Sequence, residues 1–230
     1  MDERNARTIQ MIGEGGMEKI RSAKVMIVGA GGVGSYAAEA VARAGVGTVT
    51  VVDGDEVAPS NLNRQLVALG STIGKNKAEV MAERIRDINA DATVTAVAKY
   101  YKPEGPESET VTTDLHIEDY DWIIDAIDDV DAKIELIKTA VAKNVKIVSA
   151  MGAAGKFETS FRVADISKTS VCPLAKVIRK RLRNEGIEHL PVVFSEEKPI
   201  PRDGELGTMS YVPGAMGLEL AGYVLKEIVK

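Results

Sequence analysis

The stretch KVMIVGAGGVGSYAAEAVARAGVGTVTVVD, residues 24–53, decides the fold of this chain. It opens with an apolar, β-branched run at residues 24–28 that leads into a glycine cluster, which is typical of a buried parallel strand. An alanine-rich helix is predicted for residues 33–44, ending at Gly45 and Gly47, and a second strand for residues 48–52. Together they form one strand-helix-strand unit of about 30 residues.

The same alternation continues for most of the chain. Helices are predicted at residues 75–88 and 132–143, and strands at 93–98, 122–127 and 145–150, with a Pro/Gly-rich segment at 102–109. Further predictions are extended, antiparallel structure at 156–166, a basic helix, a strand at 191–195, a loop at 196–207 that is a candidate lid, and a buried helix at 211–225. We therefore predict an α/β fold, with a Rossmann-like, doubly wound, mainly parallel sheet and a C-terminal antiparallel extension.

Length and composition favour one globular domain. The 230 residues, 45% hydrophobic and 27% charged, suffice for a nucleotide-binding core at 1–152 and a C-terminal extension at 153–230. A single cysteine and two histidines far apart in the sequence exclude a disulfide framework and a Cys/His zinc site. Residues 1–21 lack the pattern of a signal peptide, and the longest apolar run is too short for a membrane span, so we expect a cytoplasmic protein that makes no membrane contact.

The charge pattern limits contact with nucleic acid to a local surface. The formal net charge is −5, which argues against a general attraction to phosphate. One helix is nevertheless dense in basic side chains: Lys176, Arg179, Lys180, Arg181 and Arg183. By itself this pattern fits a solvated helix face or a nucleic-acid contact.

A glycine-rich turn between the first strand and helix is the first candidate binding site. Gly29, Gly31, Gly32 and Gly34 lie in a G-x-G-x-x-G pattern, in which main-chain N–H groups approach phosphate at a helix N-terminus. Asp53 ends the next strand, where a carboxylate accepts hydrogen bonds from ribose hydroxyls. The pattern indicates an adenine nucleotide, either NAD or ATP; tight helix packing without a ligand is the alternative.

Further polar residues favour ATP over NAD. Arg64 and Lys77 follow the predicted strand at 48–52 and Asp128 follows the one at 122–127, and ligands of open α/β sheets bind outside the carboxyl ends of such strands. Two cations and a carboxylate suit a triphosphate with magnesium. The sequence thus predicts that the three side chains converge on one phosphate chain.

These motifs resemble a known family. G-x-G-G-V-G-S, Asp53, S-N-L-N-R-Q at 60–65, G-K-x-K at 74–77 and D-A-I-D at 125–128 are similar to the ubiquitin-activating, ThiF/MoeB superfamily of adenylating enzymes. Within it, stretches at 163–168, 172–176, 193–197 and 210–214 resemble the TcdA-like tRNA threonylcarbamoyladenosine dehydratases.

The resemblance implies roles for individual residues. Asp53 would hold the ribose; Asn61, Arg64 and Gln65 would grip the β- and γ-phosphates; Lys77 would neutralise charge at the α-phosphate; and Asp128 would bind Mg²⁺. In this superfamily an N-terminal arginine of the partner subunit also reaches the phosphates, and Arg7 in Arg4-Asn-Ala-Arg7 would be its counterpart, with Asn5 replacing the usual aromatic residue. A homodimer is implied, and without this contact Arg7 belongs to a frayed basic terminus.

The resemblance also implies a substrate. The chain lacks the paired C-x-x-C zinc ligands of many enzymes that activate carrier proteins, which favours a small-molecule or RNA carboxylate. The implied reaction is ATP-dependent dehydration of threonylcarbamoyladenosine in tRNA through an acyl-adenylate. The alternatives are activation of a ubiquitin-like or sulfur-carrier protein and, more distantly, an NAD-dependent oxidoreductase or a ligand-holding regulatory module.

Two further expectations concern the C-terminal part. Cys172 precedes Pro173 at the start of the basic helix, where a thiolate would be stabilised, but a solitary cysteine is more often a small buried hydrophobic residue. A role for Cys172 in accepting sulfur, with a cysteine desulfurase or sulfur-acceptor protein as partner, stays open. With an RNA substrate implied, the basic helix becomes a candidate contact for the anticodon arm.

Overall fold

The computed structural model describes residues 3–102, 106, 108–109 and 111–230. Its main sheet has seven strands in the order β3-β2-β1-β6-β7-β9-β8. The strands are β1 (Lys24–Val28), β2 (Thr48–Val52), β3 (Thr93–Val97), β6 (Trp122–Asp125), β7 (Lys146–Ala150), β8 (Arg162–Asp165) and β9 (Pro191–Phe194). All neighbouring pairs are parallel except β8, which runs antiparallel to β9, so the predicted fold class and antiparallel extension are confirmed.

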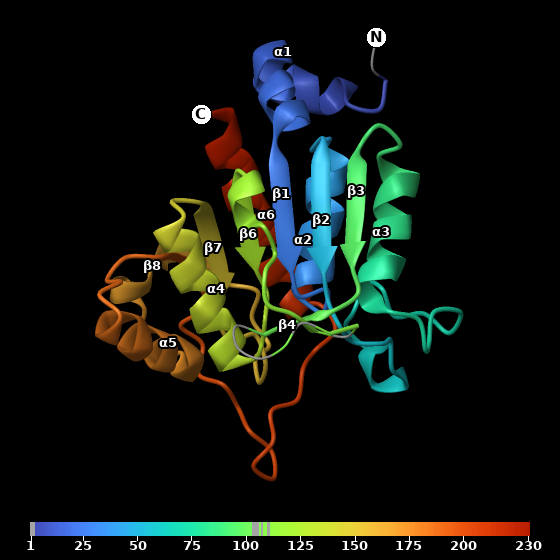
Figure 1. Ribbon diagram of the computed structural model, residues 1–230. Coiled ribbons are helices and arrows are strands. Elements are labelled where there is room, and N and C mark those ends of the chain that lie inside the picture. Colours follow the sequence, from blue (N-terminus) through green and yellow to red (C-terminus); the bar gives the residue numbers. More distant parts are fainter. Residues whose placement is uncertain (1–2, 103–105, 107, 110) are drawn as a thin grey trace.

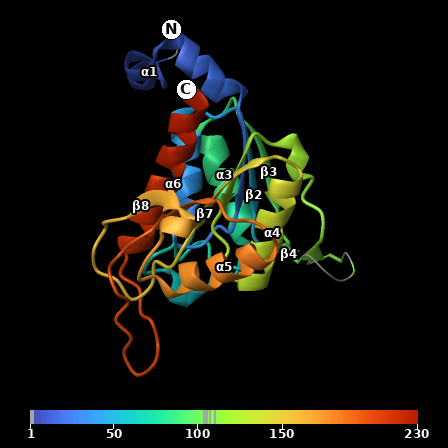
Figure 2. The ribbon, with the colours of Figure 1, turned by 90° about the vertical axis from the view of Figure 1, so that its left-hand side faces the viewer.

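Helices cover both faces of this sheet (Figures 1 and 2). On one face lie α2 (Gly34–Ala44), α3 (Lys77–Ile88) and α6 (Val212–Val229), and on the other α4 (Val130–Ala142) and α5 (Pro173–Asn184). Side chains of β1 alternate between the two cores: Val25 and Ile27 face the first, Met26 and Val28 the second. Burial on both faces explains why this strand is a continuous apolar run.

The C-terminal helix α6 is apolar because it is buried. It packs along α2, with Val212, Met216 and Leu220 fully buried. Among the described residues, no helix has both the length and the apolar character that crossing a membrane requires.

Three features extend or refine the predicted outline. Helix α1 (Ala6–Ser22), which the sequence did not predict, lies beside the C-terminus at the amino ends of the strands (Figure 1). A small parallel pair, β4 (Tyr100–Tyr101) and β5 (Val111–Thr112), lies at the opposite end, and the segment predicted at 102–109 falls partly outside the described residues. Short 3-10 turns are η1 (Pro59–Asn61), η2 (Ile117–Asp119) and η3 (Ile166–Lys168).

The predicted loop between β9 and α6 is confirmed. It carries one isolated bridge, Arg202 with Glu205, and extends beyond the carboxyl ends of the strands (Figure 1). Main-chain bonds from Gly155 to Gly207 and from Ile200 to Gly155 tie it to the segment after β7. Its function as a lid stays a prediction.

Candidate active site

A cavity of about 930 Å³ opens at the carboxyl ends of the parallel strands. Its walls come from the glycine-rich turn after β1 and from the ends of β2, β4, β6 and β7, with contributions from α5 and the start of α6. The structure brings together these predicted site residues: Gly29, Gly31, Gly32, Asp53, Arg64, Gln65, Lys77 and Asp128. Among the predicted site residues, Gly34, Asn61 and Arg7 do not line the cavity.

Two glycines of the turn are required by backbone geometry. Gly29 has φ +95°, and a Cβ there would lie 2.7 Å from the carbonyl oxygen of Ala126. A Cβ on Gly34 would lie 1.7 Å from the carbonyl oxygen of Gly29. Gly34 therefore allows α2 to start directly against the turn, which leaves the N-terminal N–H groups of the helix close to the cavity, where they favour an anion.

Asp53 is fixed by main-chain hydrogen bonds at the end of β2. Its Oδ2 accepts from the N–H of Ala30 at 2.6 Å and its Oδ1 from the N–H of Asp55 at 2.8 Å. Burial raises the pKa of Asp53, and these bonds partly counter the rise. The carboxylate is thus held rigidly beside the glycine-rich turn, the position of a ribose ligand in this fold.

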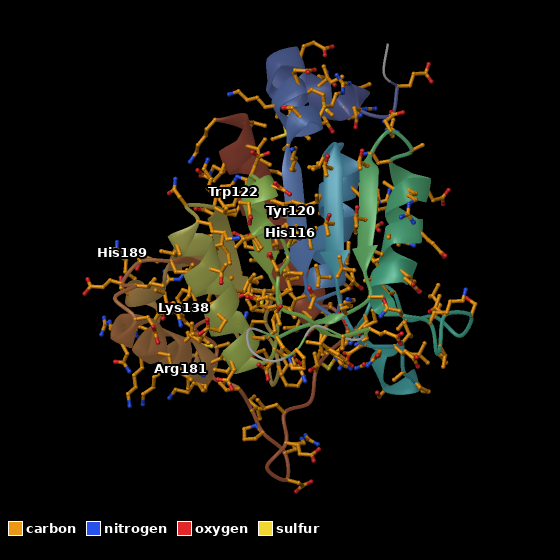
Figure 3. The ribbon with its side chains drawn as sticks, viewed as in Figure 1. His116, Tyr120, Trp122, Lys138, Arg181 and His189 are labelled. Atoms are coloured by element: carbon orange, nitrogen blue, oxygen red, sulfur yellow. The ribbon has the colours of Figure 1, made fainter. Side chains whose placement is uncertain are left out.

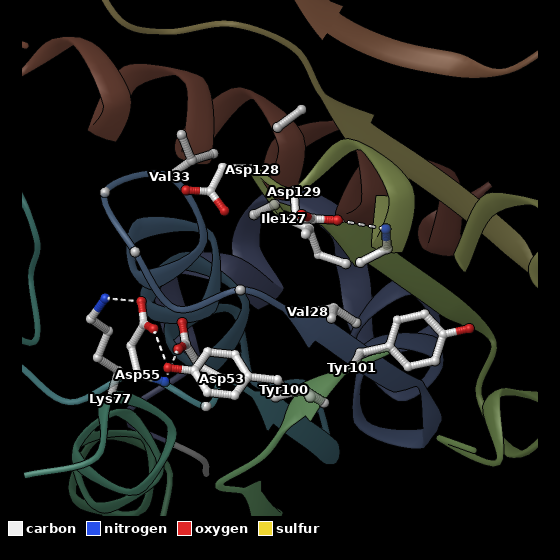
Figure 4. Close-up of a pocket in the computed structure, with 18 of the residues that line it drawn as sticks. Val28, Val33, Asp53, Asp55, Lys77, Tyr100, Tyr101, Ile127, Asp128 and Asp129 are labelled. Carbon is white, nitrogen blue, oxygen red and sulfur yellow. Dashed lines mark hydrogen bonds and ion pairs between the residues drawn. The ribbon is translucent and has the colours of Figure 1, made fainter. Parts of the chain in front are cut away.

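Lys77 is bound to an aspartate instead of extending into open space. Its Nζ donates to Asp55 Oδ2 at 2.6 Å, and the hydroxyl of Tyr100 donates to Asp55 Oδ1 at 2.8 Å (Figure 4). Burial raises the pKa of Asp55, but the bonds from Lys77 and Tyr100 outweigh it and hold the pKa below its usual value. The lysine side chain, 6% exposed, thus has one anionic partner before any ligand is considered.

A turn after η1 presents Arg64 and Gln65. The main-chain N–H groups of both donate to the carbonyl oxygen of Asn61, whose side-chain oxygen accepts from the N–H of Ala58. Asn61 therefore shapes the turn, and its contact with phosphate stays a prediction. Arg64 Nη1 donates to the carbonyl oxygen of Ser60 at 2.9 Å. The buried Oε1 of Gln65 has no hydrogen-bond partner in the described part of the chain, and Nε2 of the same amide would lie 3.7 Å from a Cβ placed on Gly31, so this incompletely bonded side chain lies beside the glycine-rich turn.

The residues present fit a magnesium ion bound together with a triphosphate. The exposed carboxylate of Asp128 lines the cavity and makes no hydrogen bond within the described residues. Mg²⁺ typically takes one or two carboxylates and completes its shell with phosphate oxygens and water. No group of three or more His, Cys, Asp or Glu side chains that could hold a metal by itself occurs in the part of the chain described, and Figure 3 shows His116 and His189 far apart.

Comparison with known proteins agrees with this geometry. The model of the ThiF family matches residues 3–230. The chain belongs to the ThiF family. It is 40% identical over 241 aligned residues to a tRNA threonylcarbamoyladenosine dehydratase of Bacillus subtilis, covering 95% of this chain and 92% of the relative.

Solved structures of one relative match the ThiF-family fold closely. The tRNA N6-threonylcarbamoyladenosine dehydratase TcdA of Escherichia coli, in complex with AMP, superposes with a TM-score of 0.88 and 34% sequence identity, covering 98% of this chain and 94% of the other. The same enzyme in complex with ATP gives a TM-score of 0.87. The resemblance found in the sequence is thus confirmed.

A buried ionic cluster under the cavity of this ThiF-family chain was missed by the sequence analysis. Lys133, Asp125 and Ser149 are fully buried, and Lys133 Nζ donates to Asp125 Oδ2 at 2.7 Å, to Ser149 Oγ at 3.3 Å and to the carbonyl oxygen of Ala150 at 3.2 Å. The three donors of the ammonium thereby have three acceptors. Asp125 Oδ1 also accepts from the N–H of Ile127, which fixes the turn that carries Asp128.

One signal in the sequence could have revealed this cluster. Lys133 lies on the same helical face as Ile137 and Ala140, four and seven residues on, so a lysine falls among core positions. A buried lysine requires an acidic partner, and Asp125 is the acidic residue that lies within the apolar strand preceding this helix.

Two predicted residues of the ThiF-family chain lie outside the cavity. Arg7 belongs to α1, at the end of the sheet away from the cavity, so it does not reach the phosphate site of its own chain (Figure 1). Cys172 is buried, and its Sγ would lie 3.5 Å from a Cβ placed on the cavity residue Gly152. This burial agrees with the interpretation of Cys172 as a small buried hydrophobic residue. Cys172 does not line the cavity, so the structure gives no support to a catalytic role.

Proposed function

We propose that this protein catalyses the ATP-dependent dehydration of threonylcarbamoyladenosine in tRNA. The observation that carries the proposal is one cavity that combines the glycine-rich turn, Asp53, Arg64, Lys77 and Asp128, in a chain similar over nearly its whole length to named dehydratases. Those relatives include a structure with ATP bound, which supports ATP as the co-substrate here.

In the proposed reaction the substrate carboxylate is converted into a mixed anhydride that has AMP as its leaving group. One carboxylate oxygen attacks the α-phosphorus of ATP and pyrophosphate leaves, which forms an acyl-adenylate. The neighbouring ureido group then attacks the acyl carbon, the ring closes and AMP leaves with the carboxylate oxygen. The modified nucleoside has lost the elements of water, and no electrons are transferred.

The chain's residues would serve this reaction by positioning and charge. Asp53 accepts hydrogen bonds from the ribose, the N–H groups at the start of α2 face the phosphates, and Arg64 and Gln65 hold the β- and γ-phosphates. Lys77 offsets the charge that develops at the α-phosphate, because fixed cations in a cavity stabilise such a transition state without reorganisation. Asp128 would hold Mg²⁺, which supplies charge neutralisation of the triphosphate.

The basic helix α5 would meet the tRNA. Leu174 and Arg181 of this helix line the cavity, which places the helix at the rim. Arg179 is bound to the carbonyl oxygen of Thr169 at 2.9 Å and Arg181 to Asp131 at 2.5 Å, so these two arginines have structural partners. The exposed residues for a phosphate contact are Lys176, Lys180 and Arg183.

The proposal includes a homodimer. Because Arg7 lies far from the cavity of its own chain, only a partner subunit can bring this side chain to the phosphates. A sulfur-acceptor protein or cysteine desulfurase as a further partner, and a cytoplasmic location, belong to the same proposal.

Mass analysis of nucleosides tests this function. The purified protein, ATP with Mg²⁺ and tRNA carrying threonylcarbamoyladenosine should yield a nucleoside lighter by one water, together with AMP and pyrophosphate. Pyrophosphate exchange that depends on a small carrier protein with a C-terminal glycine, with no change in the nucleoside, would contradict the proposal. Binding of a nicotinamide nucleotide without binding of ATP would contradict it as well.

A further inference from the structure

The segment Lys99-Tyr100-Tyr101-Lys102 borders the cavity, and apart from the hydrogen bond of the Tyr100 hydroxyl to Asp55 the proposed reaction gives it no role. All four residues line the cavity, and the two tyrosines are the aromatic side chains among its lining residues. The sequence has ten aromatic residues among 230, since it contains one Trp, six Tyr and three Phe, so two adjacent ones at this cavity are notable. Their presence between two lysines calls for a ligand with both a ring and a negative charge.

Tyr100 is held in place on one side and exposed on the other. A Cβ on Gly54 would lie 2.5 Å from Cγ of the ring, so the ring rests directly on the backbone of this glycine. The hydroxyl donates to Asp55, a bond that also raises the pKa of Tyr100 and keeps the phenol neutral. Even so, 44% of the residue is exposed. The ring is therefore a rigid apolar surface at the mouth of the cavity (Figure 4).

A nucleobase is the ligand that such a surface fits best. Proteins bind unpaired RNA bases by stacking them on aromatic rings, with basic residues beside the rings to contact the phosphates. Lys102, two residues after Tyr100, is exposed and also lines the cavity, so a basic side chain is available near the ring for such a contact. A fixed ring binds with a smaller loss of side-chain entropy than a mobile one.

The positive charge around the two tyrosines favours a base of the RNA, and not the adenine of ATP, as the ring that stacks on Tyr100. The triphosphate of one ATP is matched by Arg64, Lys77 and the magnesium site of Asp128, which lie on other elements of the cavity. Lys99 and Lys102 are additional cations beside the tyrosines, at the end of the sheet where α5 also lies (Figure 1). RNA would be a second polyanion besides ATP. A strand of RNA that crosses the cavity mouth from β4 to α5 would contact the lysines beside the tyrosines and the basic side chains of α5.

We propose that Tyr100 is a stacking platform for a base of the RNA substrate adjacent to the modified nucleotide, and that Lys102 contacts the RNA backbone. This inference rests on the proposed function, because it takes tRNA as the substrate. It assigns β4 as the part of the cavity mouth that orients the anticodon loop.

Variants of Tyr100 test the stacking. We compare Tyr100→Phe, Tyr100→Leu and Tyr100→Ala, measuring the Kd for tRNA carrying threonylcarbamoyladenosine by fluorescence anisotropy without ATP, and the Kd for ATP by calorimetry. Tyr100→Ala and Tyr100→Leu should weaken tRNA binding by about 5- to 150-fold, because the stacking ring is lost. Tyr100→Phe keeps the ring and should stay within about twofold of the wild type, and ATP binding should change little in all three.

Lys102→Ala tests the backbone contact, with Lys24→Ala as the matched control. Lys24 is exposed at the amino end of β1, at the opposite end of the sheet from the cavity. The slope of log Kd against log salt should fall by about 1 for Lys102→Ala and stay unchanged for Lys24→Ala.

Several outcomes would overturn this inference. If Tyr100→Ala and Tyr100→Leu weaken ATP binding and leave tRNA binding intact, the ring holds the adenine of ATP. If Tyr100→Phe binds tRNA as poorly as Tyr100→Ala, the bond to Asp55 matters and stacking does not. Two results separate this inference from the proposed function. If the wild-type protein dehydrates the nucleoside and Tyr100→Leu binds tRNA normally, only this inference is refuted. If the wild-type protein binds tRNA but forms no dehydrated nucleoside, the proposed function is refuted.

Discussion

Lys77 Nζ lies 2.6 Å from Oδ2 of Asp55, so the lysine assigned to the α-phosphate is already paired with a carboxylate. The two residues come from the start of α3 and the turn after β2, and Tyr100 binds the second oxygen of the same carboxylate. A triphosphate must therefore compete with Asp55 for the ammonium group. The pair sets the position of the lysine and also reduces its attraction for ATP.

Removing the charge of Asp55 should tighten ATP binding. In Asp55→Asn the amide oxygen can still accept from Lys77, but the negative charge near the phosphates is gone, and we expect the Kd for MgATP to fall about threefold to tenfold. Calorimetry at moderate ionic strength measures this change. Weaker binding of MgATP by a folded Asp55→Asn protein would mean that the carboxylate is needed to orient Lys77.

The glycine-rich turn should not tolerate a side chain at Gly29. Gly29→Ala places a methyl group 2.7 Å from the carbonyl oxygen of Ala126 at φ +95°, so we expect a loss of roughly 2 kcal/mol or more in the free energy of unfolding. Affinity for ATP should fall as well, because the turn must move. Gly70→Ala is the control, since a Cβ at Gly70 meets nothing within 4 Å. Equal stability of the two variants in urea unfolding would refute this explanation.

Removing one partner of the buried ion pair between Lys133 and Asp125 should lower the free energy of unfolding more than removing both charges. Lys133→Met leaves the carboxylate of Asp125 buried without its partner, and we expect a loss of about 3–5 kcal/mol in the free energy of unfolding. The double variant Asp125→Asn with Lys133→Met removes both charges and should recover much of this loss. Denaturant titration of the wild type, of Lys133→Met and Asp125→Asn alone, and of the double variant measures the coupling, and strictly additive effects would contradict it.

Mixing two inactive variants tests whether Arg7 acts across a dimer. Arg7→Ala and Lys77→Met should each lack dehydratase activity as homodimers. Random exchange of subunits gives one dimer in two as a heterodimer, in which one of two sites is intact, so activity should return to about a quarter of the wild-type value. Nucleoside analysis before and after exchange measures the recovery. No recovery, despite heterodimers detected by native mass spectrometry, would exclude this role of Arg7.

The ion pairs of Glu39 should make stability depend on pH. Burial alone would raise the pKa of Glu39, but bonds from Arg84 and Arg43 hold it below its usual value. The folded-state pKa is therefore the lower one, and the contribution of Glu39 is present above about pH 4.3 and lost as the pH falls through that lower pKa.

Glu39→Gln should accordingly lower the free energy of unfolding by about 1 kcal/mol at pH 7, with a smaller difference from the wild type near pH 3. Glu83→Gln, an exposed position on α3, serves as the control. Urea titrations at several pH values measure both variants. A difference that stays constant with pH would show that the charge of Glu39 is not responsible.

Much of the fold and of the candidate site could be predicted from local patterns in the sequence. The run at residues 24–53 predicts strand, helix and strand with nearly the observed bounds, because burial on both faces of a parallel sheet leaves a continuous apolar strand. Since every parallel strand ends at the same edge, Asp53 and Asp128 could be placed together from sequence order alone. Helix α1 was missed because Gly13, at φ +73°, interrupts it, although its isoleucines and Met17 pack against the core.

The sequence by itself determined the alternation of strands and helices and the edge at which the polar residues meet, because both depend on spacing along the chain. Only the tertiary structure decided which side chains pair: Lys77 with Asp55, Lys133 with Asp125, and Tyr100 on the backbone of Gly54. It also placed Arg7 at the end of the sheet away from the cavity. Side-chain partners are chosen among groups distant in sequence by packing and desolvation, which local periodicity does not encode.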